Sequence, residues 1–491
     1  MTKERHNVLL LIVDDLRPEL NCFGKKKLIT PNLDRLAQRG LQFNRAYCQM
    51  ALCMPSRLST LTGFRPPSSE GPWAVDSWCT AGEPSLPGHL KANGFTTISA
   101  GKTYHTNLDD PASWTRRYLD TFYEQSYTCD GYCSGYQLES NKQKLQNFNA
   151  GLQSLRLPPK DKPPIDLPAI TECADAPDAA YPDAKVAQRS IDEINQMAAI
   201  QTPWFLAAGF YRPHLPWAVP KKYWDLYDRD EVDLADNSLP PQNAIGFGDL
   251  GDFLHYGDRT INDTYSDLGQ YDTDSFPVLD EAKQRECVHG YWASVSFVDA
   301  QIGKVLDTLE ASGQNDNTSI ILWGDNGWHL GEHGLWSKAT NFEEATRVPL
   351  LVSSPRLPTQ NRGQSDALVE LVDLYPTVCD LAGLKPPPHL EGSSLLPLMT
   401  EPSCPWKTVA FSRYGDAITM RTERFRYTRY ERDNYQGDRN HFPSKGSCEL
   451  FDHQGDPGEN NNIAGKTEYA EHLRSVEAQF EAGWTGAVPA N

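Results

Sequence analysis

A short apolar run near the start of the chain constrains its fold more than any other segment. Residues 8–13 are continuously aliphatic and include β-branched side chains, and Asp14 and Asp15 follow at once. A strand without polar alternation is buried on both faces, which is typical of a parallel sheet covered by helices on both sides. The run is also far shorter than the ~20 residues that cross a bilayer. We therefore expect a buried parallel strand and no membrane span.

Helix and strand patterns alternate along most of the chain. Thr30 and Pro31 provide an N-cap and a first-turn proline, and Gly40 provides a stop, which together predict a helix. Such alternation predicts an α/β fold whose large domain has a mixed, mainly parallel central sheet flanked by helices. The other segments with clear patterns are strands over 204–208, 319–323 and 350–353, and helices over 58–63, 295–309 and 368–381.

The pattern changes near residue 400. Prolines at 386–388 and the segment 401–405 interrupt regular structure. Residues 417–430 then alternate between polar and apolar, as antiparallel strands do, and residues 469–480 have helical spacing. We predict a large domain over residues 1–400 and a smaller C-terminal α+β subdomain over residues 401–491, with an antiparallel sheet and a helix. Two further segments, 155–183 and 239–276, are predicted to be long loops on the large domain.

Charge and cysteine content exclude several classes of protein. The chain has 46 Lys and Arg against 65 Asp and Glu, a net charge of −19, so we expect no binding to nucleic acid. The 11 cysteines are too sparse for a disulfide scaffold and show no paired zinc spacing. The basic start leads directly into the predicted strand, without the pattern of a signal peptide. We expect a cytoplasmic protein, or a periplasmic or secreted one if a leader has been removed.

Two predicted strands end in oxygen ligands. Asp14 and Asp15 follow the first strand, and Asp325 and Asn326 follow the strand at 319–323. Functional groups of open α/β sheets gather beyond the carboxyl ends of the strands. One such pair is equally well explained as a turn or a helix cap. Two pairs favour a site for a hard cation, with calcium first and magnesium second.

Cys53 lies just before the predicted helix at 58–63. The start of a helix stabilises negative charge, which favours a reactive cysteine there, although a single cysteine is by default a buried structural residue. Its neighbours decide between these interpretations. The string Cys53-x-Pro55-Ser56-Arg57-x-x-x-Leu61-Thr62-Gly63 resembles the signature of type I sulfatases, members of the alkaline phosphatase superfamily whose cysteine is oxidised to formylglycine after translation.

The resemblance covers nearly the whole chain. Residues 30–47 and 371–377 are similar to conserved helical segments of that family, and residues 209–217 and 324–338 are similar to its iduronate-2-sulfatase branch. One position departs from that branch, because Asn326 stands where its members have histidine. A neutral oxygen ligand favours calcium over zinc.

The resemblance implies a site and an activity. Asp14, Asp15, Asp325 and Asn326 would be the calcium ligands, and Cys53 the formylglycine precursor, matured by a formylglycine-generating enzyme. The implied reaction is hydrolysis of a sulfate monoester on a sulfated oligosaccharide, in which a formylglycine hydrate attacks sulfur and a sugar alcohol leaves. The implied substrate is a 2-O-sulfated hexuronate. The side chains with implied roles in sulfate binding and proton transfer are Arg57, Lys102, His105, His214 and Lys338.

Two other functions fit the same motifs. The first is a formylglycine-dependent phosphonate monoester or phosphodiester hydrolase, and the second is an inactive, calcium-stabilised carbohydrate-binding homologue. The segments 209–217 and 324–338 favour a sulfated sugar. A desolvated uronate carboxylate needs a charged or hydrogen-bonding neighbour, and Arg212, next to His214, is one candidate, although an arginine on a loop is more often exposed to solvent. The aromatic residues Trp73, Trp78, Trp217 and Trp328 could stack on sugars, but packing in the core or in loops is the favoured prediction for each of them. The sequence does not indicate which oligomeric state the protein has.

Overall fold

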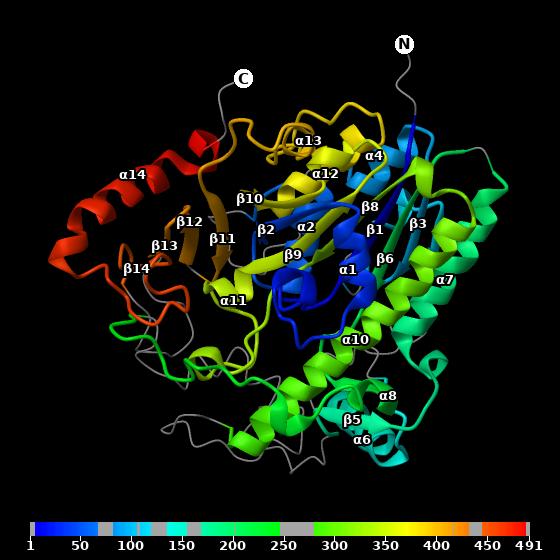
Figure 1. Cartoon of the computed structure of the whole chain (residues 1–491), viewed down its shortest axis with the longest axis horizontal. Helices are drawn as coiled ribbons and strands as arrows, with labels where there is room; N and C mark the ends of the chain where they lie inside the picture. Colours follow the sequence, from blue (N-terminus) through cyan, green and yellow to red (C-terminus); the bar gives the residue numbers. More distant parts are fainter. Residues whose placement is uncertain are drawn as a thin grey trace.

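A large mixed sheet forms the centre of the protein. A computed structural model describes residues 5–66, 82–105, 109–118, 135–154, 168–200, 202–245, 279–415, 417–431 and 444–487. The strands of the central sheet are β1 (Asn7–Val13), β2 (Leu41–Tyr47), β3 (Thr96–Gly101), β4 (Arg116–Tyr118), β6 (Trp204–Phe210), β8 (Thr318–Gly324), β9 (Arg347–Ser353) and β10 (Gly363–Glu370). Their spatial order is β10-β2-β9-β8-β1-β6-β3-β4 (Figure 1).

The central sheet is mainly parallel, as predicted. Strand β9 is antiparallel to both of its neighbours, β8 and β2, whereas the other neighbouring pairs of described strands in this sheet are parallel. Strand β1 lies between β6 and β8, and Val13 at its end is in register with Phe210 and Gly324. The carboxyl ends of these three strands therefore lie at one edge of the sheet.

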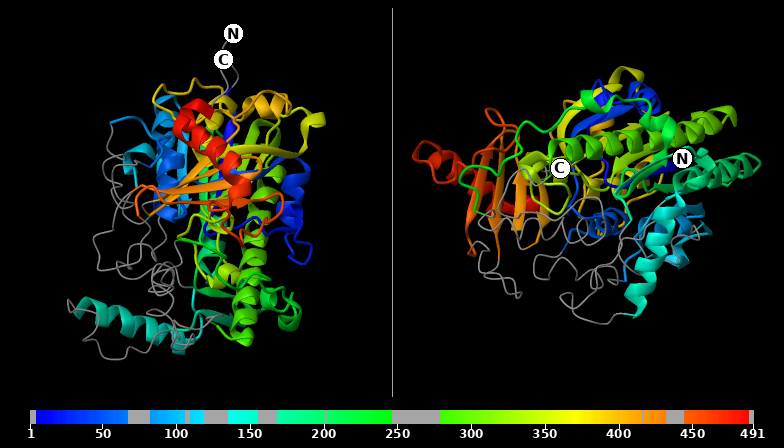
Figure 2. Two further views of the ribbon diagram at one scale, coloured as in Figure 1. Left: turned by 90° about the vertical axis from the view of Figure 1, so that its left-hand side faces the viewer. Right: turned by 90° about the horizontal axis from the view of Figure 1, so that it is seen from below.

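Helices cover both faces of the central sheet (Figure 2). Residues 8–13 of β1 are all buried, because successive strand residues point to opposite faces and both faces are covered. Leu9, Leu11 and Val13 pack with one set of helices, and Val8, Leu10 and Ile12 pack with the other. The first set is α1 (Pro31–Gln38), α7 (Pro182–Ala198) and α10 (Glu281–Ala311), and the second is α2 (Cys53–Thr62), α4 (Leu86–Ala92), α12 (Leu374–Leu381) and α13 (Leu396–Thr400).

A second sheet follows in the C-terminal part of the chain, and its strands are antiparallel, as predicted. Val476 and Phe480 of the last helix pack against Met420 and Tyr427 of this sheet. In Figure 1 this unit lies on the opposite side of the molecule from α7. The division of the chain at residue 400 stays a prediction. The elements are β11 (Ala410–Tyr414), β12 (Ala417–Arg421), β13 (Phe425–Tyr430), β14 (Cys448–Asp452) and α14 (Ala470–Ala487).

The remaining elements are short, apart from α6 (Glu139–Ser154). Strands β5 (Thr171–Ala174) and β7 (Trp217–Pro220) form a small parallel pair. Within the residues that the structure describes, the other α-helices are α8 (Lys221–Trp224) and α11 (Glu343–Thr346), and several single 3₁₀ turns join the larger elements. No helix in the described part of the chain combines the length and the apolar character needed to cross a membrane.

Two local predictions were wrong. The helix predicted over 368–381 begins as the end of β10, and α12 starts only at Leu374 after a 3₁₀ turn. Leu368 and Val369 pair with β2, and a short apolar run does not distinguish a strand from a helix. The loop predicted over 155–183 contains β5, which pairs with a strand more than 40 residues away, and it ends inside α7.

Parts of the predicted loops cannot be compared with the structure. Residues 155–167 and 246–276 lie outside the described residues, as do Trp73 and Trp78. Residues 239–245 contain neither helix nor strand. Trp217 and Trp328 are buried in the core, as predicted.

Candidate active site

Four adjacent parallel strands, in the order β8-β1-β6-β3, present their carboxyl ends at one edge of the central sheet. This edge is where an open α/β sheet places its functional groups. The segments that leave the four strands carry most of the predicted site residues. These are Asp325 and Asn326 after β8, Asp14 and Asp15 after β1, His214 after β6, and Lys102 and His105 after β3.

A pair of glycines allows the last two strands of this set to approach closely. The Lys102 amide donates to the Gly209 carbonyl over 2.9 Å. A Cβ atom on Gly209 would lie 1.8 Å from the Lys102 carbonyl oxygen, and one on Gly101 would lie 2.3 Å from the Gly209 carbonyl oxygen. Gly101 also has a φ of +72°, which other residues rarely adopt. Glycine at both positions therefore fixes where Lys102 leaves the sheet.

Asp14 is paired with two cations in the interior. Its carboxylate is fully buried and contacts Lys102 Nζ and, over 3.3 Å, Arg57 Nη2. Burial opposes its ionisation, but the charges of Lys102 and His214 hold the pKa of Asp14 well below its usual value. Asp14 is therefore a buried anion that depends on its neighbours.

The two strand ends that carry oxygen ligands are also linked to each other. The Asp15 amide donates to Asp325 Oδ1 over 3.0 Å, and Asn326 Nδ2 donates to Asp15 Oδ1 over 2.8 Å. Burial raises the pKa of Asp325 to about 7, although Arg57 opposes this shift. Asp15 itself has a φ of +57°, a left-handed conformation that turns the chain sharply after β1.

The oxygen atoms at this edge fit a hard cation. One carboxylate oxygen each from Asp14, Asp15 and Asp325 lie within 4.8 Å of one another. Asp15 Oδ2 and Asn326 Oδ1 are buried and have no hydrogen-bond partner in the described part of the chain. A buried acceptor without a partner is costly, and calcium prefers several oxygen ligands of this mixed kind. The chemistry of the donors thus suits calcium, with magnesium second.

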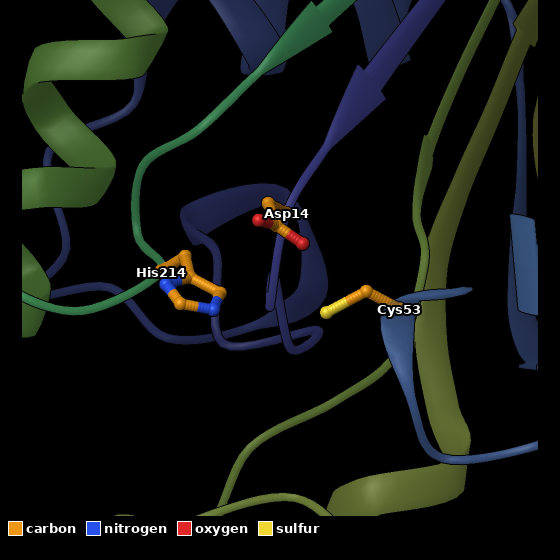
Figure 3. A group of neighbouring side chains, drawn as sticks. All are labelled: Asp14, Cys53 and His214. Carbon is orange, nitrogen blue, oxygen red and sulfur yellow. The ribbon is translucent and has the colours of Figure 1, made fainter. Parts of the chain in front are cut away.

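Cys53 is the first residue of α2 and points toward the same space (Figure 3). Its sulfur, a carboxylate oxygen of Asp14 and a ring nitrogen of His214 lie within 4.8 Å of one another. Lys338 Nζ donates to the sulfur over 2.7 Å. Burial and then Asp14 nevertheless raise the pKa of the Cys53 thiol well above its usual value. The expectation that the helix start favours a Cys53 anion was therefore wrong for the unmodified thiol.

Arg57 joins three of the strand ends. It lies four residues after Cys53, so both side chains are on one face of α2. Its Nε donates to Asp325 Oδ2 over 2.6 Å, and its Nη1 donates to the Lys102 carbonyl. Together with the contact to Asp14, these bonds connect the ends of β8, β3 and β1. The spacing in the signature thus places a potential nucleophile and its supporting cation side by side.

The remaining predicted residues surround Asp15. Lys338 Nζ contacts Asp15 Oδ1, and although burial opposes it, Asp15 raises the pKa of Lys338 well above its usual value. His214 Nε2 lies 3.8 Å from Asp15 Oδ2, and Nδ1 lies 2.7 Å from the Leu215 carbonyl oxygen. His105 is half-buried, and burial and then Lys102 lower the pKa of His105 well below its usual value. The structure thus brings all ten predicted site residues to one place.

Comparisons with known proteins agree with this geometry. Residues 6–384, more than half of the chain, match the sulfatase family. The chain belongs to the sulfatase family. It is a type I sulfatase of the alkaline phosphatase superfamily, and hence a sulfuric ester hydrolase. Residues 331–483 also match the C-terminal region of N-sulphoglucosamine sulphohydrolase.

Individual relatives of this sulfatase cover most of its length. It is 33% identical to iduronate 2-sulfatase of Mus musculus over 78% of this chain and 70% of that protein. A solved structure in complex with its substrate, D-glucosamine-2-N,6-O-disulfate, has a TM-score of 0.71 at 21% identity and covers 99% of this chain and 98% of its own. The structure of the phosphonate monoester hydrolase of Silicibacter pomeroyi has a TM-score of 0.70 at 22% identity, and the match covers 99% of this chain and 96% of the hydrolase chain. The two solved structures share the fold.

Arg212 of this sulfatase does not have the surroundings predicted for it. Its side chain is 1% exposed, and its guanidinium donates to the backbone carbonyls of His214 and Ala218. Each of the three guanidinium nitrogens donates to one of these carbonyls, which contradicts the prediction of a cation that faces a substrate carboxylate. Arg212 instead supports the loop that carries His214.

Sequence reasoning also missed two neighbours of Asp15 in this sulfatase. The Tyr291 hydroxyl donates to the Asp15 carbonyl over 2.9 Å, and Arg17, two residues after Asp15, reaches into the loop after β8. Tyr291 lies on α10, where its helical spacing resembles that of any core residue. The position of Arg17 next to the paired aspartates was the one available signal.

Proposed function

We propose that this sulfatase hydrolyses sulfate monoesters on carbohydrates, with a 2-O-sulfated hexuronate as its substrate class, by means of formylglycine derived from Cys53 and a calcium ion. The observation that carries the proposal is the convergence of three cations on the space around Cys53, namely the fully buried Arg57 and Lys102 and the partly buried Lys338. A dianionic transition state needs such preorganised positive charge. The similarity to mouse iduronate 2-sulfatase supports the uronate.

The metal ligands in this proposal are Asp14, Asp15, Asp325 and Asn326. Calcium bound there would neutralise charge on the sulfate oxygens. The buried oxygens of Asp15 and Asn326 that have no hydrogen-bond partner among the described residues support this assignment. Arg57 holds two of the carboxylates from the side of α2, so it would keep the ligands in place.

Formylglycine at position 53 would supply a hydrated aldehyde, whose two hydroxyl groups allow attack on sulfur and later release of sulfate. The chain's own residues are arranged to serve that position. Lys338 donates to the Cys53 sulfur, so its ammonium lies beside the atom that would become the nucleophile. Asp15 Oδ1 lies 3.6 Å from the same sulfur and can accept a proton from a group at that position.

His214 and Lys338 are the proton carriers that we assign to the leaving alcohol. The Leu215 carbonyl can only accept a hydrogen bond, so His214 Nδ1 carries the proton and Nε2 faces Asp15. The Leu215 bond fixes the ring orientation, as a partner on the second nitrogen does in many active sites. Lys102 contacts Asp14 and is placed to bind a sulfate oxygen, and His105 lies close enough for the charge of Lys102 to lower the pKa of His105.

One experiment tests the nucleophile and the reaction together. The protein would be produced with a formylglycine-generating enzyme, and wild type and Cys53→Ala would be compared for sulfate released from an aryl sulfate. We expect release by wild type, none above background by Cys53→Ala, and a Cys53 peptide whose mass shows formylglycine. The matched control is Cys173→Ala, because Cys173 is an exposed free thiol. Turnover by protein that contains only unmodified cysteine would contradict the mechanism.

The substrate class is tested with defined saccharides. We expect sulfate release from a 2-O-sulfated uronate at a non-reducing end to exceed release from a neutral sulfated hexose. The reverse ranking would contradict the proposed substrate and leave the reaction intact. Parallel rates on an aryl phosphonate test the second candidate function, which the fold shared with a phosphonate monoester hydrolase keeps open. An inactive carbohydrate-binding protein would release no sulfate in any assay.

A further inference from the structure

Two loops carry five of the ten residues of the proposed site, and the ion pair between Arg17 and Glu332 is one of the contacts that join these loops. The first loop runs from Asp14 to Arg17 after β1, and the second runs from Asp325 to Lys338 after β8. We propose that Arg17 and Glu332 are positioning residues that fix Asp15 and Lys338 relative to each other. This inference rests on the proposed function, because it assigns these two residues to the same reaction.

The side chain of Arg17 bonds to the second loop at two points. Its Nη2 donates to Glu332 Oε1 over 2.8 Å, and its Nη1 donates to the Trp328 carbonyl over 3.0 Å. Arg17 and Glu332 are 315 positions apart in sequence, and their side chains are 11% and 13% exposed. The planar guanidinium holds two acceptors at fixed angles, which a lysine ammonium cannot do equally well. The contact therefore sets orientation as well as distance.

Glu332 in turn shapes the loop that leads to Lys338. Its Oε2 accepts from the Leu330 amide over 2.6 Å. The His329 amide donates to the Ser337 carbonyl over 2.8 Å, so the loop closes immediately before Lys338. One carboxylate thus connects the turn of this loop to Arg17, while the closed loop places the ammonium of Lys338 beside Cys53.

The Asp15 side of the connection is anchored in the same way. The Tyr291 hydroxyl accepts from the Arg17 amide over 3.0 Å and donates to the Asp15 carbonyl over 2.9 Å. These bonds hold the left-handed backbone of Asp15, a conformation that persists only where its surroundings fix it. The backbone of Arg17 therefore supports Asp15, and its side chain supports the loop of Lys338.

Arg17 acts through its neighbours rather than on substrate. Its side chain contacts the Trp328 carbonyl and the carboxylates of Glu19, Glu332 and Glu344, and none of these groups belongs to the set of ten site residues. A shift of ~1 Å in a supporting contact can lower a rate about a hundredfold. Loss of an outer partner of a metal site weakens metal binding by about 10–100-fold.

The test compares Arg17→Lys, Glu332→Gln and the double variant with wild type. Each variant would be assayed for kcat and KM on an aryl sulfate, and for calcium binding by calorimetry on metal-stripped protein. We expect each single variant to lower kcat about tenfold, to change KM less than about threefold, and to weaken calcium binding about tenfold. If the two residues act as one unit, the double variant loses no more than the worse single variant.

The matched control is Glu281→Gln, which removes the carboxylate of the Arg285–Glu281 pair on α10. This variant keeps wild-type kcat and calcium affinity if the Arg17 effect is specific. The inference would be overturned if both single variants had wild-type kcat and calcium affinity. It would also be overturned if the losses of the single variants multiplied in the double variant. Both outcomes assume that the wild-type protein is active in the same assays. A wild type that neither releases sulfate nor binds calcium would overturn the proposed function as well.

Discussion

Three ion pairs, each with a fully buried acid, hold the proposed site together at the scale of single residues. Lys102 contacts Asp14, Lys338 contacts Asp15, and Arg57 contacts Asp325. Each pair joins an acid at a strand end to a base from a different segment. When one partner of a buried pair is removed, the other charge is left without compensation. A single substitution in this group therefore disturbs more than the side chain it changes.

Asp14→Asn removes the charge of one proposed ligand and keeps its shape. We expect it to lower kcat/KM for an aryl sulfate by about 100-fold or more, because weaker calcium binding leaves the sulfate oxygens without that positive charge and Lys102 loses its anionic partner. Calcium binding, measured by calorimetry, would weaken in parallel. The control is Asp307→Asn, whose side chain is 63% exposed. Undiminished turnover by metal-stripped Asp14→Asn would contradict the calcium assignment.

The parts of the site that could be predicted are those with a local signal. Cys53 and Arg57 are four residues apart in a signature, and the acids directly follow continuous apolar strands. The pairing of Arg17 with Glu332 could not be predicted, because 315 positions separate the two residues. The role of Arg212 could not be predicted either, because the sequence places it near His214 but does not show that its guanidinium donates to the backbone.

At the scale of elements, the local sequence predicts some strands of the central sheet and not others. Strands β1, β6 and β8 could be predicted because each is buried throughout and reads as an apolar run. Strand β3 contains Thr, Ser and Gly, and β2 mixes polar and apolar residues. These two segments form strands because of the neighbouring strands with which they pair. Such pairings are tertiary, and propensity alone does not reveal them.

Gly209→Ala tests whether the close contact of β3 and β6 positions Lys102. The new Cβ would lie 1.8 Å from the Lys102 carbonyl oxygen, and the backbone must move to relieve this overlap. We expect the free energy of unfolding to fall by ~1–3 kcal/mol, as in other overpacked interiors. We also expect kcat to fall about tenfold, because Lys102 moves with its carbonyl.

Urea unfolding and steady-state kinetics measure the two effects of Gly209→Ala. Gly455→Ala is the control, because an added Cβ there meets no described atom within 4 Å. If Gly209→Ala and Gly455→Ala behaved alike, steric restriction at the end of β6 would not be what positions Lys102.

At the scale of the whole molecule, a buried ion network joins the C-terminal sheet to the central one. Arg426 on β13 contacts Glu343 of α11 and also contacts Glu459. The Glu343 amide donates to Glu459 Oε2 over 2.8 Å, and His453 Nε2 lies 2.8 Å from Glu459 Oε1. The sequence indicated both sheets but not this network, because its members come from three distant segments. The network makes the attachment of the C-terminal sheet depend on ionised carboxylates.

We therefore predict that acid weakens the attachment of the C-terminal sheet to the rest of the protein. Burial opposes ionisation of Glu459, but Arg426 and His453 lower the pKa of Glu459 to about 2. A carboxylate whose pKa is lower in the folded state stabilises it above the unfolded pKa, and this stability is lost as pH falls toward the folded pKa. Glu459→Gln should therefore lower the melting temperature at about pH 7, and its difference from wild type should narrow at about pH 3.5. Exposed Glu471→Gln provides the baseline. A Glu459→Gln deficit that stays constant between the two pH values would show that packing, and not the charge of Glu459, attaches the C-terminal sheet.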